Sequence, residues 1–491
     1  MFRAFAILVV IAALASGALY VAAGRSQPPT LTIDKPDRAV GQQSELQITA
    51  GAPGARFSSL VVTLEQNGRT MPLFALENPG SATLAQPDGD HIRVTRRVGK
   101  VSVPELQQGP ARIVVAATRK SFLNLRTLSA STARDIQVKL EPPRIAVLST
   151  HHYVNHGGSE MVLYRATPPD ITSGVRVGEV EYRGFPASGA GVATTDPALN
   201  VAFFALLHDQ DLRTPIAAFA RDEAGNDAKV SFVDNTFNKP MRRSRIELDD
   251  KFLQRVVPEI LEHAKELGPS EASGDLLGNF LRINGELRRL NADQIVTITA
   301  NTSPTMLWKG PFIQLGNSKV EASFADHRTY FYHGKEVDRQ VHLGFDLAVT
   351  SAIPVLAAND GKVLYASWLG IYGNCLILDH GMGIASLYGH LSSIDVKVGD
   401  SVTKGQTLGR SGMTGLAGGD HVHFTMLVAG HPVNPVDWWD PHWIRDRVER
   451  KLGEGSADAG GEGASQRSSA SQPSGRGKPQ KAGQTQRRKR A

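Results

Sequence analysis

The sequence predicts a mainly β protein, and three observations support this fold class. Short strand-like runs separated by turn signals fill most of residues 29–240. The apolar pattern then changes to a helical period over residues 248–291. Strand-like runs resume near Ile295, and later ones carry histidines on one strand face. We therefore expect β modules, a short helical segment and a C-terminal antiparallel β domain, in that order.

The first 240 residues divide into two strand-rich stretches. In the first stretch the pair Asn67-Gly68 separates two strand-like runs, and this pair tolerates the positive φ angles of a hairpin turn. The pair Pro142-Pro143 marks a boundary before the second stretch. Regularly spaced short strands predict two immunoglobulin-like sandwiches, at residues 29–141 and 142–240. A single larger β domain is the alternative interpretation.

Residues 246–295 are predicted to form a helical segment. Apolar residues recur every four positions from Phe252 onward, and Gly268-Pro269 ends the first helix. A second, weaker helix is predicted over residues 275–290. A packed helical pair is the simplest interpretation, and a regulatory or partner-binding role is the alternative.

Residues 1–25 have the features of a targeting segment. Residues 4–23 carry no charge and follow Arg3, which predicts a single membrane anchor in the inner membrane with the bulk of the chain in the periplasm. A cleaved signal peptide, which would release the chain into the periplasm, is the alternative. Both interpretations place the remaining chain outside the cytoplasm.

The basic character of the chain belongs to its C-terminal segment. Eight of the 54 basic residues lie in residues 467–490, which contain no acidic residue, so the rest of the chain is close to neutral. Residues 453–491 are rich in Gly, Ser and Gln and are predicted to be a disordered basic tail. One interpretation is that this tail is merely solvated, and the alternative is that it contacts anionic polymers or lipid head groups. No nucleic acid partner is expected.

Histidines and one carboxylate form the candidate chemical site. Cys375 is the only cysteine, so a metal here would have to be held by His and carboxylate groups. His342 and Asp346 are four residues apart and share one strand face, as do His421 and His423. His390 follows a glycine in a third strand-like run, and a glycine-rich loop at 409–420 leads into His421.

The order HxxxD, GH and HxH within about 80 residues resembles the lysostaphin/LytM-type zinc metallopeptidases. The resemblance predicts a peptidase domain at residues 305–445, with its core at 340–437. It implies one Zn²⁺ per catalytic domain, held by three ligands, and a catalytic pair of histidines. The implied ligands are His342, Asp346 and His423. The implied catalytic pair is His390 and His421, and how the two divide their roles stays open.

The same resemblance implies hydrolysis of peptide cross-links or stem peptides of bacterial peptidoglycan by a zinc-activated water. The alternative is a non-catalytic LytM-like regulator that binds the cell wall or activates an amidase. The complete set of five chemical positions favours the enzyme. One departure concerns residues 416–420, where many family members have a Ser-Thr-Gly-Pro type stretch, so the preferred bond is left open.

Overall fold

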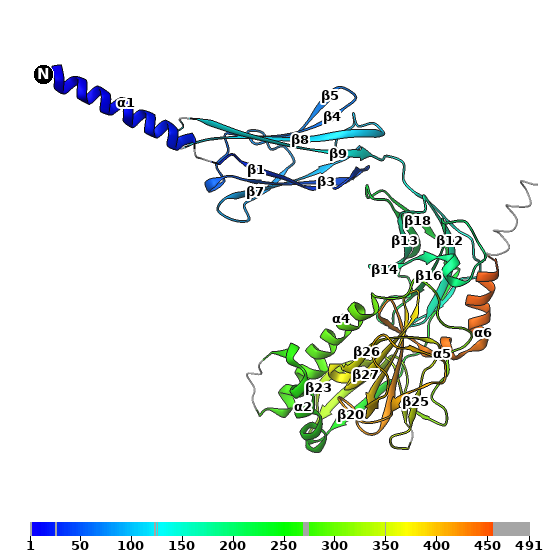
Figure 1. The fold of residues 1–491 in the computed structure, drawn as a ribbon. Helices are drawn as coiled ribbons and strands as arrows, with labels where there is room; N and C mark the ends of the chain where they lie inside the picture. The colour runs from blue at the N-terminus through cyan, green and yellow to red at the C-terminus, as the bar shows by residue number, and fades with distance from the viewer. Residues whose placement is uncertain are drawn as a thin grey trace, which may run out of the picture.

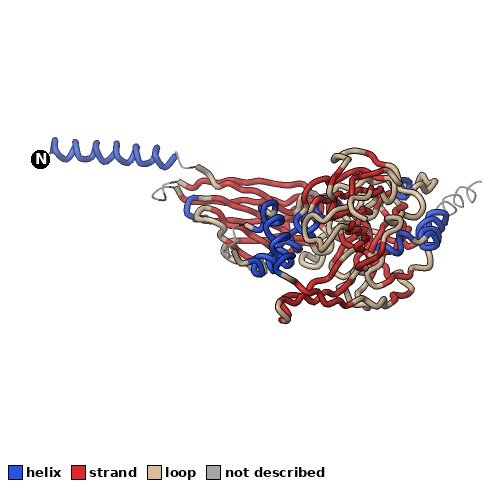
Figure 2. The backbone as a smooth tube through the Cα atoms, turned by 90° about the horizontal axis from the view of Figure 1, so that it is seen from below, coloured by secondary structure: helices blue, strands red, loops and turns tan. Residues whose placement is uncertain are grey.

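The computed structural model describes residues 2–24, 27–121, 124, 126–268, 274–348 and 350–454. Strands dominate these residues, which confirms the predicted mainly β fold (Figures 1 and 2). Helix α1 (Phe2–Gly24) projects from one end of the molecule, and two groups of sheets lead from it to the C-terminal domain (Figure 1). The predicted basic tail lies, from residue 455 onward, outside the described residues.

The predicted membrane anchor is contradicted. Among the residues that the structure describes, no helix combines the length and the apolar character needed to cross a membrane. The prediction that α1 anchors the chain in the inner membrane is therefore wrong.

Two mostly antiparallel sheets with a shared core follow α1, and the pair β2–β9 is parallel. The Asn67-Gly68 turn has φ angles of 51° and 74° and joins two paired strands, as its sequence predicts. Buried residues such as Ile48, Val62 and Ile113 fill the space between the sheets. One sheet has the order β1 (Thr30–Lys35), β3 (Ser44–Gly51), β7 (His91–Val98), β6 (Thr83–Ala85). The other has the order β2 (Ala39–Val40), β9 (Thr127–Val138), β8 (Gly109–Lys120), β4 (Ser59–Gln66), β5 (Arg69–Ala75).

The second strand-rich stretch shares its core with the C-terminal domain. Phe203 contacts both Trp308 and Trp438, with ring centroids 6.3 and 5.9 Å apart, so apolar burial joins the two parts. One sheet has the order β10 (Arg144–Val147), β12 (Ser159–Thr167), β16 (Leu199–Ala205), β15 (Phe185–Pro186). Another has the order β14 (Val180–Arg183), β13 (Thr172–Val177), β17 (Ile216–Arg221), β18 (Asp227–Ser231). A parallel pair is formed by β11 (Tyr153–Asn155) and β19 (Asn235–Phe237). The predicted module boundaries remain predictions.

The helical segment is longer than its sequence pattern suggests. Asp249 caps α2 (Asp250–His263) by accepting a hydrogen bond from the backbone of Phe252. The segment continues through α3 (Leu276–Arg282), a π-helical turn (Ile283–Leu287) and α4 (Arg288–Thr299). The expectation that strands resume near Ile295 is wrong. Ile295 lies on the buried face of α4. The helical period of apolar residues is hard to recognise in this part of the sequence, because some buried positions carry polar residues such as Asn291.

The C-terminal domain is built on an eight-stranded antiparallel sheet. Its order is β21 (Lys319–Ala322), β24 (Phe345–Ala348), β32 (His421–Val428), β28 (Ile384–Leu391), β27 (Asn374–Gly381), β26 (Gly361–Trp368), β30 (Ser401–Val402), with β33 (His431–Val433) beside β32. A three-stranded sheet contains β20 (Arg243–Leu248), β22 (Asp326–Tyr332) and β23 (Lys335–His342), and another contains β25 (Pro354–Leu356), β31 (Thr407–Arg410) and β29 (Ser393–Ile394). The chain ends its described part with α5 (Pro435–Trp439), α6 (Pro441–Trp443) and further helical turns.

Candidate metal centre

Strand pairing brings the three predicted ligands together. Strands β24 and β32 are antiparallel neighbours, and their register sets Asp346 opposite His423. His342 ends β23, just before the chain turns into β24. The potential ligand atoms of these three residues all lie within 4.8 Å of one another, and they are the only such His, Cys or acidic group found among the described residues.

The three facing atoms are spaced as ligands of one small cation would be. His342 Nε2 lies 2.9 Å from Asp346 Oδ1 and 3.0 Å from His423 Nδ1. His423 Nδ1 lies 3.1 Å from the same Asp346 oxygen. Ligands at ~2.0–2.2 Å from a tetrahedral zinc ion are separated from each other by roughly 3.3 Å. The observed triangle is slightly tighter than that arrangement.

Hydrogen bonds on the far side of each imidazole determine which nitrogen faces the triangle with a lone pair. His342 Nδ1 donates to the Ser323 carbonyl oxygen at 3.3 Å. The Thr425 hydroxyl donates to the Leu343 carbonyl, so it accepts from His423 Nε2 at 2.9 Å. When both rings are neutral, two nitrogen lone pairs and a carboxylate oxygen face one another. This donor set fits Zn²⁺, which relieves their mutual repulsion.

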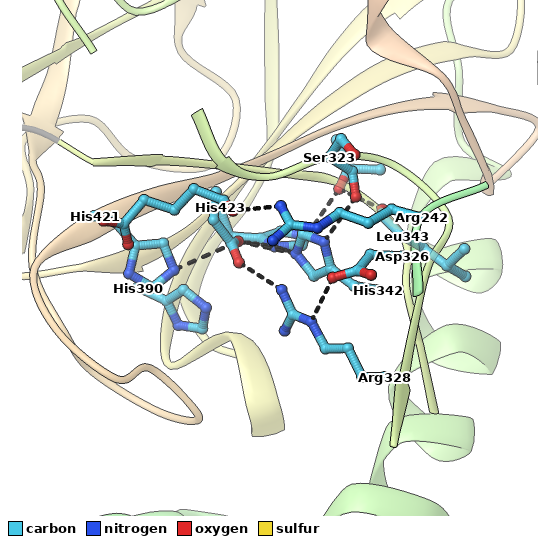
Figure 3. A network of polar contacts seen from close by, with 12 residues as sticks. Arg242, Ser323, Asp326, Arg328, His342, Leu343, His390, His421 and His423 are labelled. Atoms are coloured by element: carbon cyan, nitrogen blue, oxygen red, sulfur yellow. Dashed lines mark hydrogen bonds and ion pairs between the residues drawn. The ribbon is translucent and has the colours of Figure 1, made fainter. Parts of the chain in front are cut away.

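A row of polar side chains orients Asp346 and was not identified from the sequence. Arg328 Nη2 donates to Asp346 Oδ2 at 2.9 Å, and Arg328 Nε lies 3.4 Å from Asp326 Oδ2 (Figure 3). Asp326 in turn accepts a hydrogen bond from the Ser244 hydroxyl at 2.8 Å. Burial raises the pKa of Asp346, but its histidine neighbours, His342 above all, outweigh that effect and hold the pKa well below its usual value.

The signal that would have found Asp326 is the hairpin register. Counting pairs outward from the β22–β23 turn, with one bulge after Tyr330, puts Asp326 opposite His342. The turn itself is visible in the sequence at His333-Gly334, but the bulge is not. Without the bulge, the predicted register is shifted by one residue, and residues other than Asp326 are placed opposite His342.

The predicted catalytic histidines lie beside the triangle. The rings of His390 and His421 have centroids 4.8 Å apart (Figure 3). Each Nδ1 donates to a backbone carbonyl at 2.8 Å, that of Thr414 for His390 and that of Gly419 for His421. Each ring therefore keeps its Nε2 available, and His421 Nε2 lies 3.4 Å from Asp346 Oδ1.

The two histidines differ in their electrostatic surroundings. Burial holds the pKa of His390 well below its usual value, and the neighbouring histidines act in the same direction. Burial also lowers the pKa of His421, but the hydrogen bond to Asp346, the charge of Asp346 and the Gly419 carbonyl together outweigh it and leave the pKa raised. Before any cation enters the site, His390 is thus neutral while His421 more readily carries a proton.

All five residues line a cavity of about 570 Å³. The sheet forms one wall, and β20 with the helical segment forms another through Phe252, Phe280 and Arg288. The ring of Tyr372 lies 5.3 Å from that of His423 at the boundary between these walls. Burial raises the pKa of Tyr372 to about 12, while the Arg288 charge opposes this shift. The helical segment therefore contributes directly to the cleft.

Glycines allow close approach at two places in the site. A Cβ atom on Gly344 would lie 2.5 Å from His423 Nε2, so the gap between His342 and Asp346 is occupied by the third ligand. Gly415 has a φ of 69°, and a Cβ atom there would lie 2.5 Å from the backbone nitrogen of Gly373. By contrast, a Cβ atom on Gly418 would meet no atom within 4 Å.

Comparison with known proteins finds relatives for the C-terminal domain. The family model described as peptidase family M23 matches residues 340–435. The DD-carboxypeptidase/endopeptidase Mpg of Neisseria meningitidis is 37% identical over 97 residues, which are 20% of this chain and 22% of that protein. The peptidoglycan DD-endopeptidase ShyA of Vibrio cholerae is 40% identical over 95 residues, 19% of this chain and 22% of that protein. The murein hydrolase activator EnvC of Escherichia coli is 36% identical over 95 residues, 19% of this chain and 23% of that protein.

The similarity is confined to one part of each protein. The chain spans about a fifth of the length of these curated relatives. Among solved structures, a putative peptidase M23 from Pseudomonas aeruginosa matches 58% of this chain and 94% of its own length at 20% identity, with a TM-score of 0.33. The residues that the family model matches carry the HxxxD, GH and HxH motifs of the cleft. Residues 340–435 therefore form a peptidase M23 domain of the lysostaphin/LytM type.

Proposed function

We propose that this chain is a zinc-dependent metalloendopeptidase that hydrolyses the peptide cross-links or stem peptides of bacterial peptidoglycan. The observation that carries the proposal is the triangle of His342 Nε2, Asp346 Oδ1 and His423 Nδ1, whose edges measure 2.9 to 3.1 Å. Three protein ligands leave a fourth tetrahedral position open, as in catalytic rather than structural zinc sites.

The chemistry divides between the ion and the protein. Zinc, when bound, supplies Lewis acidity that polarises a carbonyl group and makes water nucleophilic near neutral pH. Arg328 and Thr425 keep the ligand atoms turned toward the site through the hydrogen bonds described above. His390 and His421 present Nε2 atoms beside it, which suits them to accept a proton from the attacking water and to stabilise the developing oxyanion.

The substrate class rests on the M23 domain and its relatives. Mpg and ShyA are named as a DD-carboxypeptidase/endopeptidase and as a peptidoglycan DD-endopeptidase, and they are similar to this chain over 97 and 95 residues. A cavity of about 570 Å³ is large enough for several residues of an extended peptide.

Digestion of cross-linked sacculi by the purified full-length chain tests the proposal. We expect release of uncross-linked or shortened muropeptides, loss of that release with a chelator, and its recovery on adding zinc. His423→Ala should abolish both zinc binding and cleavage. His442→Ala is the matched control, because His442 is 74% exposed and outside the cavity.

The same experiment separates the enzyme from a regulator. EnvC is named as a murein hydrolase activator, so a regulator of another hydrolase is the second candidate function. Unchanged muropeptides in every sample, together with stimulation of an added amidase, would establish the regulator and remove the peptidase. The presence of both His390 and His421 beside a full ligand triangle supports the peptidase.

A further inference from the structure

The helical segment places a guanidinium group in the wall of the metal cleft. Arg288 is half-buried at the start of α4 and lines the same cavity as the ligand triangle. Its Nε donates to the backbone oxygen of Asn284 at 3.1 Å, and its Nη2 donates to the side-chain oxygen of Asn284 at 2.6 Å. A single residue therefore holds the guanidinium by two bonds.

Asn284 is itself held in place by burial and by a hydrogen bond to Asp338. It is fully buried, and its Nδ2 donates to Asp338 Oδ2 at 2.7 Å. It belongs to the π-helical turn at Ile283–Leu287, a rare conformation that is frequent at functional sites. The arrangement restrains a long side chain before any ligand arrives, which lowers the entropic cost of binding.

The charge of Arg288 is not neutralised within the protein. No carboxylate of the described residues forms an ion pair with it, whereas Arg328 pairs with Asp346 and Arg245 with Glu247 in the same cavity. Arg288 has five N–H groups, of which Asn284 uses two. No hydrogen bond of its Nη1 is seen within the described part of the chain, and this atom is not buried without a partner, so it is accessible to solvent.

The surroundings of Arg288 favour binding an anion near the catalytic centre. Its charge acts on Tyr372, whose ring lies 5.3 Å from that of His423. Apolar side chains line the same wall, including the fully buried Phe280. A partly apolar wall strengthens the interaction of a cation with an incoming carboxylate.

We propose that Arg288 binds a free carboxylate of the substrate peptide next to the bond that is cut, and so selects anionic peptides over their amidated counterparts. The fork of an arginine matches a carboxylate through two parallel N–H···O bonds, and Asn284 acts as its positioning residue. This inference rests on the proposed peptidase function and specifies the substrate class of that site.

Two synthetic cross-linked peptide dimers test the inference. They share one sequence, and the carboxylates beside the cross-link are free in the first and amidated in the second. We expect the wild-type chain to show a kcat/KM about 10- to 100-fold higher for the free-carboxylate dimer, the range for a hydrogen bond to a charged group. Arg288→Gln should lose that preference, with its kcat/KM for the free-carboxylate dimer falling to the value for the amidated dimer. Arg289→Gln is the matched control, because Arg289 is exposed and pairs with Asp293 outside the cavity.

Each outcome decides between the two levels of the proposal. Failure of the wild-type chain to cut either dimer or intact sacculi overturns the peptidase function. Equal cleavage of both dimers, or an unchanged preference in Arg288→Gln, overturns the carboxylate subsite and leaves the peptidase standing. Equal loss on both dimers in Arg288→Gln assigns Arg288 a structural role and also overturns the subsite.

Discussion

Lys451 and Glu160 form a fully buried ion pair, with Nζ 2.9 Å from Oε1 and side chains that are 1% and 0% exposed. The two residues are 291 positions apart and join the last described helix to strand β12. Lys451 also donates to the backbone oxygen of Met161 at 2.9 Å. The pair therefore connects the helix that follows the M23 domain to the preceding β stretch, and both side chains are shielded from water.

Lys451→Met should destabilise the chain strongly. The substitution keeps the length of the side chain but removes the nearer cation of the buried Glu160 carboxylate and leaves only Arg447, whose Nε lies 3.7 Å from Glu160 Oε2. Loss of the nearer partner costs about 3–5 kcal/mol of unfolding free energy. Denaturant unfolding at neutral pH measures this loss. Arg450→Ala is the control, because Arg450 is 57% exposed in its ion pair with Asp446 and should cost under about 1 kcal/mol. Similar losses for both variants would show that burial of the pair does not matter.

Asp437 should make stability depend on pH. Burial raises its pKa to about 6 from an ordinary 3.8, although the hydrogen bond from Asn155 opposes the shift. A raised pKa in the folded chain means that its stabilising contribution is present below about pH 4 and is lost as the pH rises through 6. Asp437→Asn removes this dependence. We expect the variant to gain on the order of 2–3 kcal/mol relative to wild type between pH 4 and 7.

Parallel unfolding series at pH 4, 5, 6 and 7 check the Asp437 prediction. The difference between variant and wild type should grow with pH and level off above pH 6. A constant difference would mean that the carboxyl titrates normally. Asp440→Asn is the control, because that carboxylate is 48% exposed and caps the next helix.

Local patterns predicted much of this structure, and long-range pairing accounts for the rest. The Asn67-Gly68 hairpin and the Asp249 helix start follow from residues next to each other in sequence. The candidate ligands were proposed from motifs that resemble a known peptidase family. Strand spacing alone would not have given them, because His342 and Asp346 lie on different strands, β23 and β24. Arg328 could not, because its role depends on a bulge that shifts strand register. Nor could Glu160 and Lys451, whose partnership depends on how distant elements pack.

Arg328→Gln should weaken zinc binding. The guanidinium holds Asp346 Oδ2, so its loss frees the carboxylate to turn away from the two histidines. Loss of such an outer partner typically lowers metal affinity about 10- to 100-fold. Competition with a coloured zinc chelator measures the change. Arg339→Gln on the neighbouring strand, 75% exposed, should bind zinc as the wild type does. Unchanged or tighter binding in Arg328→Gln would show that orientation of Asp346 is not limiting.

Gly415→Ala should disturb the wall of the cleft, because the added methyl group would meet the backbone of the neighbouring loop. The residue has a φ of 69°, which costs an alanine ~1–2 kcal/mol, and the new Cβ would lie 2.5 Å from the backbone nitrogen of Gly373 and 2.7 Å from the Ile371 oxygen. Because both neighbours are backbone atoms, relief requires the two loops to separate, and overpacking of this kind adds about 1–3 kcal/mol.

Separation of these loops should also lower catalytic activity. His390 is oriented by the carbonyl of Thr414, the residue before Gly415, so movement of the loop turns that ring. We expect Gly415→Ala to lower unfolding free energy by about 2–5 kcal/mol in total and to lower kcat on sacculi even at temperatures where it is fully folded. Gly418→Ala, whose Cβ meets no atom within 4 Å, should keep wild-type stability. Equal stability of the two variants would show that contact between the loops is not what fixes the cleft wall.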